Sequence, residues 1–473
     1  MPPLPKPTEM REIALPSRTG RLAAETDVLV VGGGPAGLGA AVGAASAGAR
    51  VVLAERYGFV GGMATSALVM PLASYFTSEL AATRAGDAGL VPTDSVRGRP
   101  VIGGVLQQLI DRLVAVGGAI APSELSGYVT PFDAEAFKNV ATDALDDASV
   151  ELLLHAFASG ALLEDGRVTG VVFETKSGPL AVRASCVVDC TGDGDIAASA
   201  GAPYEVGRSE DGLTQPMTLY FQLLEFDRPA FEAYVETHSG QWFGVFGLWD
   251  LIREAHEAHE FSPPREDILM FATPFADEVA MNSTRVTEVL GTDVFDLTRA
   301  EWEGHRQARE IAHFMREHVP GFERSRVKQT GAQVGVRETR RILGEYVLSA
   351  DDVLEARKFD DAVARNAYPM DIHNPRGRGT MLRRVPPCEA YDIPLRCLVP
   401  RDVDGLLVAG RCISATHEAL SSVRVMPSCV ATGQAAGVAG ALAVLGDVSP
   451  RRLLAEAVQA ELRKQGAALT VPS

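Results

Sequence analysis

Residues 27–55 read DVLVVGGGPAGLGAAVGAASAGARVVLAE, and this stretch decides the fold of the chain. An apolar strand runs into Gly32, Gly34 and Gly37 at the spacing G-x-G-x-x-G, a helix of small residues follows, and a second apolar strand ends at the acid Glu55. Strand, glycines, helix, strand and acid in this order form a dinucleotide-binding βαβ unit. A chance cluster of glycines, the alternative interpretation, does not explain why all these parts are in register.

Each part of this unit has a physical task. Gly32 makes the tight turn, Gly34 lets a pyrophosphate approach the backbone, and Gly37 lets helix and strand pack closely. The phosphates then lie at the positive end of the helix and need no Lys or Arg. Glu55 can accept hydrogen bonds from both hydroxyls of the adenosine ribose, and its charge would repel a 2′-phosphate. We therefore expect no NADP in this site.

The composition limits the partners of the chain. Its 473 residues, 46% of them hydrophobic, suffice for two or three domains and for a site that encloses a large cofactor. A net charge of -17 opposes binding to nucleic acid or to anionic lipid, so neither is expected as a partner. The first twenty residues are polar and Pro-rich without a secretory pattern, and no window approaches an uninterrupted apolar span of transmembrane length. We expect a soluble, cytoplasmic protein without membrane insertion.

Cysteine and histidine spacing predicts no metal site. The six cysteines contain no C-x-x-C pair, and we expect them to be buried free thiols. His256 and His259 lie three residues apart in a run of charges, which is typical of a solvated helix face rather than of a metal-ligand pair.

The chain after the βαβ unit alternates helices and strands. A helix is expected over 101–118, and a second helix is capped by Asp133 and leads into a strand over 150–157. Three further strands are joined by turns at 165–166 and 176–178, which predicts an antiparallel meander.

The character of the sequence changes from about residue 203 to 330. Strands are expected near 218–224 and 268–271, and a long helix has a predicted capping box of Thr298 with Glu301. An aromatic cluster comprises Trp242, Phe243, Phe246 and Trp249. This segment is expected to form a second domain over the cofactor.

The last part of the chain returns to a Rossmann-like pattern. Residues 405–410 form a short buried parallel strand, and Pro427 begins a helix of small residues. An amphipathic helix over 449–466 closes the chain, and core packing is its expected role.

Several separated segments carry a family resemblance: VVGGGPAG, ERYGFVGGMAT, VVDCTGDGDIAASAGAPYE, GVRETRRILGEYVL, YDIPLRCLVP and LLVAGRCISATHEALSSVRVMPSCVATGQAAG. Together they resemble the FAD-dependent oxidoreductases built like glutathione reductase and fumarate reductase flavoproteins. More narrowly, they are similar to the bacterial family known simply as FAD-dependent oxidoreductases, which is related to the flavin module of heterodisulfide reductase. The resemblance spans nearly the whole chain.

The resemblance implies noncovalent FAD. It implies that the helix begun by Pro427 points its positive end at the flavin pyrimidine ring. Arg411 stands where many members of the resembled family have an Asp that binds the ribityl chain. Gly61 and Gly62 are followed by Met63 and not by a histidine that could bind the flavin covalently. The implied cofactor-binding residues are Gly32, Gly34, Pro35, Ala36, Gly37, Glu55, Arg56, Gly62, Met63, Thr191, Gly192, Asp193, Gly410, Arg411, Met426 and Pro427.

The order of elements favours FAD over NAD independently of the resemblance. A meander interrupts the parallel sheet, and the sheet resumes some two hundred residues later, which fits one long cofactor lying across a discontinuous domain. No second G-x-G-x-x-G with its acid indicates an NAD(P)H domain.

We therefore expect an α/β fold with a discontinuous Rossmann-like FAD-binding domain, an antiparallel β-meander and an α+β substrate domain. The FAD-binding domain is expected in three parts, the last with the C-terminal helix. The predicted divisions are 1–24 (N-terminal arm), 25–75 (FAD, first part), 76–130 (insert or cap), 131–202 (FAD, second part with the meander), 203–330 (substrate or cap domain) and 331–473 (FAD, third part).

The candidate catalytic residues lie in two of the family segments. His417, Glu418 and Arg424 precede the flavin-facing helix, and Arg337 lies in GVRETRR. His373 is a further candidate. Arginines bind a carboxylate or phosphate in a bidentate manner, and a histidine is the commonest general base. Each residue taken alone has a purely structural alternative, such as an Arg that holds a cofactor phosphate.

The leading functional hypothesis is an enzyme that oxidises, or reduces, a small organic substrate, expected to be anionic, by hydride transfer at flavin N5. Oxygen, a quinone or a carrier protein would take the electrons. The alternative is a flavoprotein in which FAD is structural or serves non-redox chemistry, as in a hydratase or isomerase. Fold does not determine the substrate.

Overall fold

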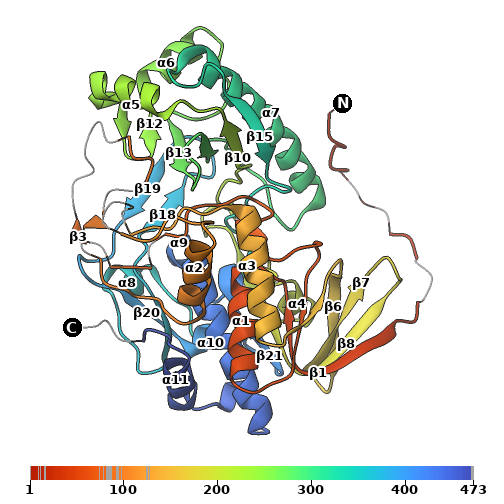
Figure 1. The fold of residues 1–473 in the computed structure, drawn as a ribbon. Helices are drawn as coiled ribbons and strands as arrows, with labels where there is room; N and C mark the ends of the chain where they lie inside the picture. Colours follow the sequence, from red (N-terminus) through yellow and green to blue (C-terminus); the bar gives the residue numbers. More distant parts are fainter. Residues whose placement is uncertain are drawn as a thin grey trace.

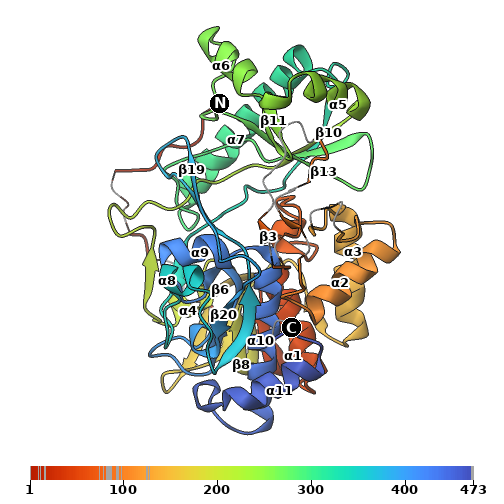
Figure 2. The same ribbon diagram turned by 90° about the vertical axis from the view of Figure 1, so that its left-hand side faces the viewer.

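The structure is a computed structural model that describes residues 2–8, 10, 12–14, 18–73, 75–77, 79–80, 88–91, 95–96, 98–123, 126 and 128–469. Two sheets organise it, one in the lower and one in the upper half of Figure 1. The same two layers are separated in the perpendicular view of Figure 2. The expected α/β fold with a Rossmann-like sheet and an antiparallel meander is confirmed.

The lower sheet has the strand order β5-β2-β1-β8-β7-β6, and β21 pairs with β8. The parallel strands are β1 (Arg21–Val31), β2 (Val51–Ala54), β5 (Glu151–Leu153), β8 (Leu180–Asp189) and β21 (Leu406–Val408). The antiparallel meander consists of β6 (Phe157–Glu164), β7 (Arg167–Glu174) and the same β8. The late strand β21 therefore completes a sheet begun by the first strand of the chain.

Two strand expectations need correction. The strand expected over 150–157 is divided, because His155 has a φ of 55° and separates β5 from β6. Strand β1 begins at Arg21, which pairs with Leu180 of β8, so the end of the expected N-terminal arm belongs to the sheet. Residues 1, 9, 11 and 15–17 of that arm lie outside the described residues.

Helices α1 (Pro35–Ser46) and α10 (Met426–Leu445) are packed backbone to backbone. A Cβ added at Gly433 or Gly437 would lie 2.0 Å from the carbonyl oxygen of Ala36 or Ala40, respectively. A Cβ added at Gly39 would lie 2.2 Å from the carbonyl oxygen of Val430. Glycines on both helices therefore allow an approach that no other residue permits. Helices α2 (Val105–Ala115) and α3 (Ala134–Asp147) pack against α1, and Asp133 caps α3 as predicted.

The upper sheet is antiparallel, in the order β11-β12-β13-β14-β10-β15. Its strands are β10 (Phe221–Leu224), β11 (Trp242–Phe243), β12 (Phe246–Gly247), β13 (Ile268–Ala272), β14 (Glu278–Met281) and β15 (Arg326–Thr330). Helices α5 (Arg228–Thr237), α6 (Trp249–Glu257) and α7 (Val294–His318) lie around it in Figure 1. It has its own core, separate from that of the lower sheet.

The predicted capping box of α7 is wrong. The helix begins one turn earlier, because the Asp293 carboxylate accepts hydrogen bonds from the backbone N–H groups of Phe295 and Asp296. Thr298 is already helical and donates to the Val294 carbonyl, and Glu301 accepts from the N–H of Val334. An Asp at the N-cap is a stronger cap than a Thr.

Small elements connect the two sheets. The paired strands are β3 (Glu79–Leu80) with β4 (Ser95–Val96), β9 (Tyr204–Val206) with β16 (Arg340–Ile342), β17 (Ala362–Asn366) with β20 (Tyr391–Pro394), and β18 (Met370–His373) with β19 (Thr380–Arg383). The short helices are α4 (Asp195–Ser199), α8 (Ala350–Leu354) and α9 (His417–Val423). The closing helix is divided into a 3-10 turn (Pro450–Arg452) and α11 (Ala455–Lys464), because Leu453 and Leu454 are extended.

Helix α10 corrects the expectation that no segment reaches transmembrane length. Its 20 residues have a mean hydropathy of 1.5 and could span a membrane by length and composition. However, 78% of the apolar window is buried inside the protein. Its glycine contacts with α1 account for this burial, and it has the surroundings of a core helix.

Replacing Gly437 by Ala should destabilise the protein by about 1–3 kcal/mol or more, because the new methyl group would overlap the Ala40 carbonyl. Gly440→Ala is the matched control on the same helix, since its added Cβ would meet only side-chain atoms, the nearest being the Cys186 sulfur at 3.3 Å. Both changes raise helix propensity equally. Denaturant unfolding of the two variants measures the difference, and equal midpoints would contradict the packing role of Gly437.

Candidate active site

One cavity of about 800 Å³ runs from the dinucleotide-binding motif to the upper sheet. It lies at the carboxyl ends of the parallel strands, where α/β sheets bind ligands. The motif residues that line it are Gly32, Gly34, Pro35, Ala36, Glu55, Arg56, Gly62, Met63, Thr191, Gly192, Gly410, Arg411, Met426 and Pro427. Gly37 and Asp193, which were also expected to contact the cofactor, do not line it.

The three motif glycines differ in their surroundings as their tasks require. Gly32 has a φ of +100°, and its added Cβ would lie 2.5 Å from the Cys190 carbonyl oxygen. A Cβ on Gly37 would lie 1.8 Å from the Gly32 carbonyl oxygen, so this residue serves helix packing. A Cβ on Gly34 would have only Gly62 within reach, at 3.7 Å, and would otherwise project into the cavity.

Two helices begin at the cavity without side-chain caps. Neither α1 nor α10 has a side-chain hydrogen bond at its N-cap, and neither has an acid in its first turn. Helix N-termini present unsatisfied N–H groups and a partial positive charge. Both ends therefore suit an anionic or electron-rich ligand group in the cavity.

Glu55 is 5% exposed and is held by the backbone around it. Its two carboxylate oxygens accept hydrogen bonds from the N–H groups of Gly33 (2.6 Å) and Tyr57 (3.0 Å). An ionised carboxylate has about four acceptor sites, so about two remain for ligand hydroxyls. Residues 156–158 continue the cavity wall beside Glu55. The sequence did not single them out, because the predicted strand ran through them.

Arg411 lines the cavity and is held by a neighbouring acid. It forms an ion pair with Asp193 at 3.0 Å, and its guanidinium lies 2.8 Å from where a Cβ of Gly192 would be. Asp193 therefore positions Arg411 instead of lining the cavity itself. Asp195 does line the cavity and pairs with Arg340 at 2.8 Å.

Arg56 connects the motif to the second domain. Its guanidinium donates to the Gln333 side-chain oxygen at 2.7 Å, and the Tyr57 hydroxyl donates to the same oxygen. Gln333 follows β15 of the upper sheet and also lines the cavity. This contact joins the two parts of the cavity wall, one from each sheet.

Arg337 and Arg424, two of the predicted catalytic residues, line the cavity together. Arg337 donates to the Pro216 carbonyl and the Thr218 hydroxyl, both at 2.7 Å. Burial, with repulsion from Arg424, lowers the pKa of Arg337 to about 9. The Nε of Arg424 is buried and has no hydrogen-bond partner among the described residues.

Two further buried arginines line the same cavity, Arg265 and Arg285. Burial, with repulsion from Arg265, lowers the pKa of Arg285 to about 10. Sequence reasoning missed both, because only the tertiary structure brings the ends of β13 and β14 to the motif. Although burial opposes its ionisation, Asp371 has a pKa below its ordinary value because His373, Arg424 and Arg337 favour the carboxylate.

Asp371 and His373 form a pair on β18. His373 Nε2 lies 3.2 Å from Asp371 Oδ2, and the Tyr368 hydroxyl donates to the same oxygen at 3.3 Å. Burial lowers the pKa of His373 to about 3, so its imidazole is neutral at neutral pH. Its Nδ1 lies 3.3 Å from the Arg285 guanidinium, a distance that allows it to accept a hydrogen bond. Burial also raises the pKa of Tyr220, which lines the cavity near these residues.

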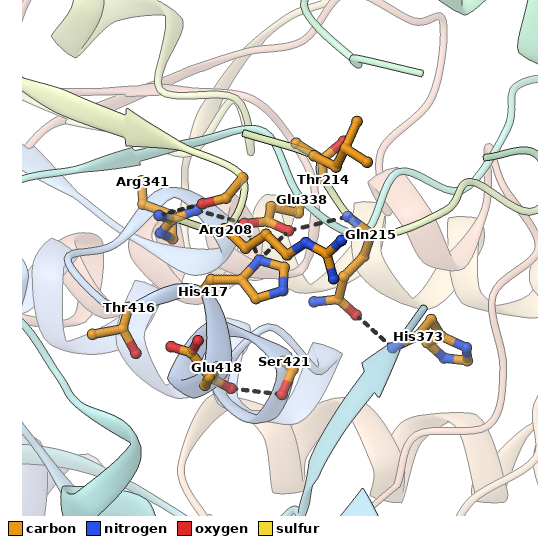
Figure 3. Close-up of polar contacts among 12 residues, drawn as sticks. Arg208, Thr214, Gln215, Glu338, Arg341, His373, Thr416, His417, Glu418 and Ser421 are labelled. Carbon is orange, nitrogen blue, oxygen red and sulfur yellow. Dashed lines mark hydrogen bonds and ion pairs between the residues drawn. The ribbon is translucent and has the colours of Figure 1, made fainter. Parts of the chain in front are cut away.

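His417 and Glu418 do not line the cavity, contrary to the expectation that they contact the substrate. His417 is buried, and its Nδ1 lies 2.9 Å from the Glu338 carboxylate. Figure 3 shows His417 turned toward Glu338, whereas Glu418 points away from this group. Proximity in sequence to α10 does not bring them to its N-terminus, because α9 turns the His417 side chain toward the loop that carries Glu338.

Glu338 nevertheless connects His417 to the cavity wall. Its carboxylate also pairs with Arg341 at 2.5 Å and accepts from the N–H of Gln215 at 3.1 Å. The side-chain oxygen of Gln215 accepts from Arg424 and from the N–H of His373, both at 3.4 Å. Figure 3 shows the contacts of Glu338 with Arg341, His417 and Gln215, and the contact of Gln215 with His373.

Comparison with known proteins gives two partial matches. Digeranylgeranylglycerophospholipid reductase 1 of Methanopyrus kandleri is 31% identical over 168 residues, which are 36% of this chain and 40% of that protein. Thiamine thiazole synthase of Aeropyrum pernix is 31% identical over 208 residues, which are 39% of this chain and 66% of that protein. The chain thus spans less than two thirds of the length of either relative.

A solved structure, a geranylgeranyl bacteriochlorophyll reductase-like protein of Thermoplasma acidophilum, aligns over 94% of this chain and 82% of that chain with 14% identity and a TM-score of 0.45. The model of the family described as FAD dependent oxidoreductase matches residues 27–462, which include the whole cavity wall and both sheets except the first six residues of β1. The chain therefore belongs to the FAD-dependent oxidoreductase family.

Proposed function

We propose that the protein oxidises, or in the reverse direction reduces, a small anionic organic molecule by hydride transfer at the flavin N5 atom. One observation carries this proposal: a single cavity joins the dinucleotide-binding motif to a group of buried arginines. An otherwise acidic protein, with a net charge of -17, needs a reason to bury cations together. An anionic substrate supplies that reason.

The residues of the lower sheet fit FAD. Glu55 would accept the hydroxyls of the adenosine ribose, and Gly34 with the uncapped start of α1 would hold the pyrophosphate. Arg411 and its neighbouring backbone would hold the ribityl region, and Met426 and Pro427 would bring the start of α10 to the flavin. Bound FAD supplies two-electron chemistry and accepts a hydride at N5. The open space beside Gly34, which a Cβ would partly fill, supports this fit.

Arg337 and Arg424 would bind the anionic group of the substrate. Arg337 is anchored by two short hydrogen bonds, which fix its free edge toward the cavity. The buried and unpartnered Nε of Arg424 supports a ligand acceptor at this point, since an unmade hydrogen bond of a buried donor costs about 1–3 kcal/mol.

The Asp371–His373 pair is proposed to accept the proton released in oxidation. Both groups line the cavity. Burial, with the charges of the nearby arginines, lowers the pKa of His373, and His373 together with the same arginines lowers the pKa of Asp371 against the effect of burial. A substrate anion beside Arg337 and Arg424 would offset these positive charges and so raise the basicity of the pair. The base would thus become stronger when substrate is present.

His417 is proposed to act as a positioning residue. Through Glu338 and Gln215 it would hold Arg424 and the backbone of His373, without contacting the substrate. Glu418 has no such connection, and we assign it no part in the reaction.

We also propose a finer family assignment. The protein would belong to the glutathione reductase and fumarate reductase type of flavoprotein, with a link to the flavin module of heterodisulfide reductase. The meander between β5 and β21 supports it. We also propose the domain divisions given above, with the N-terminal arm ending before Arg21, and oxygen, a quinone or a carrier protein as electron acceptor. A cytoplasmic location is proposed as well, supported by five buried free cysteines: Cys186, Cys190, Cys397, Cys412 and Cys429.

Replacing Glu55 by Ala should weaken FAD binding by at least about tenfold, because hydrogen bonds to a charged acceptor contribute about 1.5–3 kcal/mol each. Equilibrium titration of apoprotein with FAD measures this change. Glu25→Ala, which removes an exposed acid from β1, is the control and should bind FAD like the wild type. Unchanged affinity in the Glu55 variant would exclude its role as the ribose acid.

The function itself is tested by anaerobic mixing of holoprotein with a panel of small organic acids and their neutral amides. We expect loss of the visible flavin absorbance with at least one acid and not with its amide. With that acid, Arg337→Lys should raise the half-saturating concentration by about tenfold with little change in the limiting rate, since the charge stays but the bidentate fork is lost. Arg299→Lys, on the exposed face of α7, should change neither value.

Protein that binds no FAD, or that is reduced equally well by the neutral amides, would contradict the proposed function. Bound FAD that no compound reduces, together with an acid consumed without electron transfer, would favour the non-redox alternative.

A further inference from the structure

Three aromatic side chains form a cluster in the part of the cavity wall that the upper sheet contributes. Phe243 and Phe246 come from the hairpin of β11 and β12, and Trp249 begins α6. The ring centroids of Phe243 and Phe246 lie 5.6 and 5.9 Å from that of Trp249, with interplanar angles of 65° and 87°. These are edge-to-face contacts of the kind that aromatic groups prefer.

This cluster lies at the edge of the hydrophobic core, against which Phe246 packs. Trp242, the neighbour of Phe243, is fully buried and packs edge-on against Phe231 in the core. Phe243, Phe246 and Trp249 are instead only partly buried, and all three line the cavity. Their uncovered ring surface therefore faces the space where a ligand would lie.

The backbone beside the cluster is strained. Leu248 has a φ of +70° and a ψ of 30°, although its side chain is fully buried and it is not a glycine. A left-handed conformation costs a residue of this kind about 1–2 kcal/mol. The strain sets the start of α6 and with it the position of Trp249, which is typical of a functional site.

Two unpartnered polar atoms lie in the same part of the wall. The Arg265 side chain is 6% exposed and Asn282 is 9% exposed, and both line the cavity. Arg265 Nε and Asn282 Oδ1 have no hydrogen-bond partner among the described residues. One donor and one acceptor are thus left for a ligand, which an empty apolar wall would not require.

We propose that the substrate is a planar aromatic anion, with its ring against Phe243, Phe246 and Trp249 and its charge on the buried arginines. This inference rests on the proposed function and narrows its substrate class. The aromatic cluster and the arginines line one cavity, and β12, which carries Phe246, pairs with β13, which Arg265 precedes by three residues. Arg265 and Asn282 would pair with polar substituents of the ring.

Benzoate and cyclohexanecarboxylate are suitable probes, since they share charge and carbon number and differ in the ring. We expect holoprotein to bind benzoate at least about twofold more tightly, because aromatic contacts contribute about 0.5–1.5 kcal/mol beyond buried area. Isothermal titration calorimetry measures both affinities without requiring turnover.

Trp249→Ala should abolish the preference for benzoate, and Phe246→Leu, which keeps an apolar side chain, should reduce it. Trp302→Ala is the matched control, because Trp302 is 45% exposed on α7 and does not line the cavity. It should keep the wild-type preference. The Phe246 variant gives an answer even where loss of Trp249 impairs folding.

The binding data for the variants test the aromatic site and the anion site separately. Arg337→Lys should weaken both probes to the same extent. If it does so while Trp249→Ala and Phe246→Leu leave the preference unchanged, or if wild type shows no preference, the aromatic inference is overturned and the anion site stands. If Arg337→Lys weakens neither probe, the anion site of the proposed function is the part that fails.

Discussion

The close packing of α1 against α10 is the constraint on which the rest of the structure depends. The two helices lie almost four hundred residues apart in the chain. At the glycines of each helix, a carbonyl oxygen of the other helix lies so close that a Cβ would overlap it. Since both helices begin at the same cavity, this contact brings two uncapped N-termini to one ligand site. The late strand β21, which pairs with β8, completes the same arrangement.

The sequence predicted the parts of this arrangement that are locally encoded. All parts of the βαβ unit lie within 29 consecutive residues, and the meander is marked by its own turns at 165–166 and 176–178. Where two local signals competed, the prediction was wrong. Thr298 with Glu301 has the pattern of a capping box, but the N-cap of the helix is Asp293, five residues earlier. Propensity alone does not decide between two caps, because a helix extends to the stronger one.

The substrate end of the cavity was predictable only in part, for a physical reason. Arg337 and Arg424 lie in family segments next to motif elements, and both line the cavity. Arg265 and Arg285 stand in segments without any motif, and only the antiparallel pairing of β13 with β14 brings them there. His417 shows the converse error, since closeness in sequence to α10 does not determine where a side chain points.

A second layer of polar contacts explains how arginines can be kept in a buried wall before a ligand arrives. Glu338 is fully buried and compensates Arg341, while it also fixes His417 and the backbone of Gln215. Gln215 in turn contacts Arg424 on one side and the β18 backbone on the other. Arg424 also donates to the Asp371 carbonyl of β18 at 3.5 Å, so its rotation away from the cavity would break contacts with two separate segments. A buried polar chain is stable only when most of its members are satisfied. Among these residues two donors have no partner, Gln215 Nε2 and Arg424 Nε, and of the two residues Arg424 is the one that lines the cavity. The same chain that makes the guanidinium rigid thus leaves its free donor where a substrate anion can reach it.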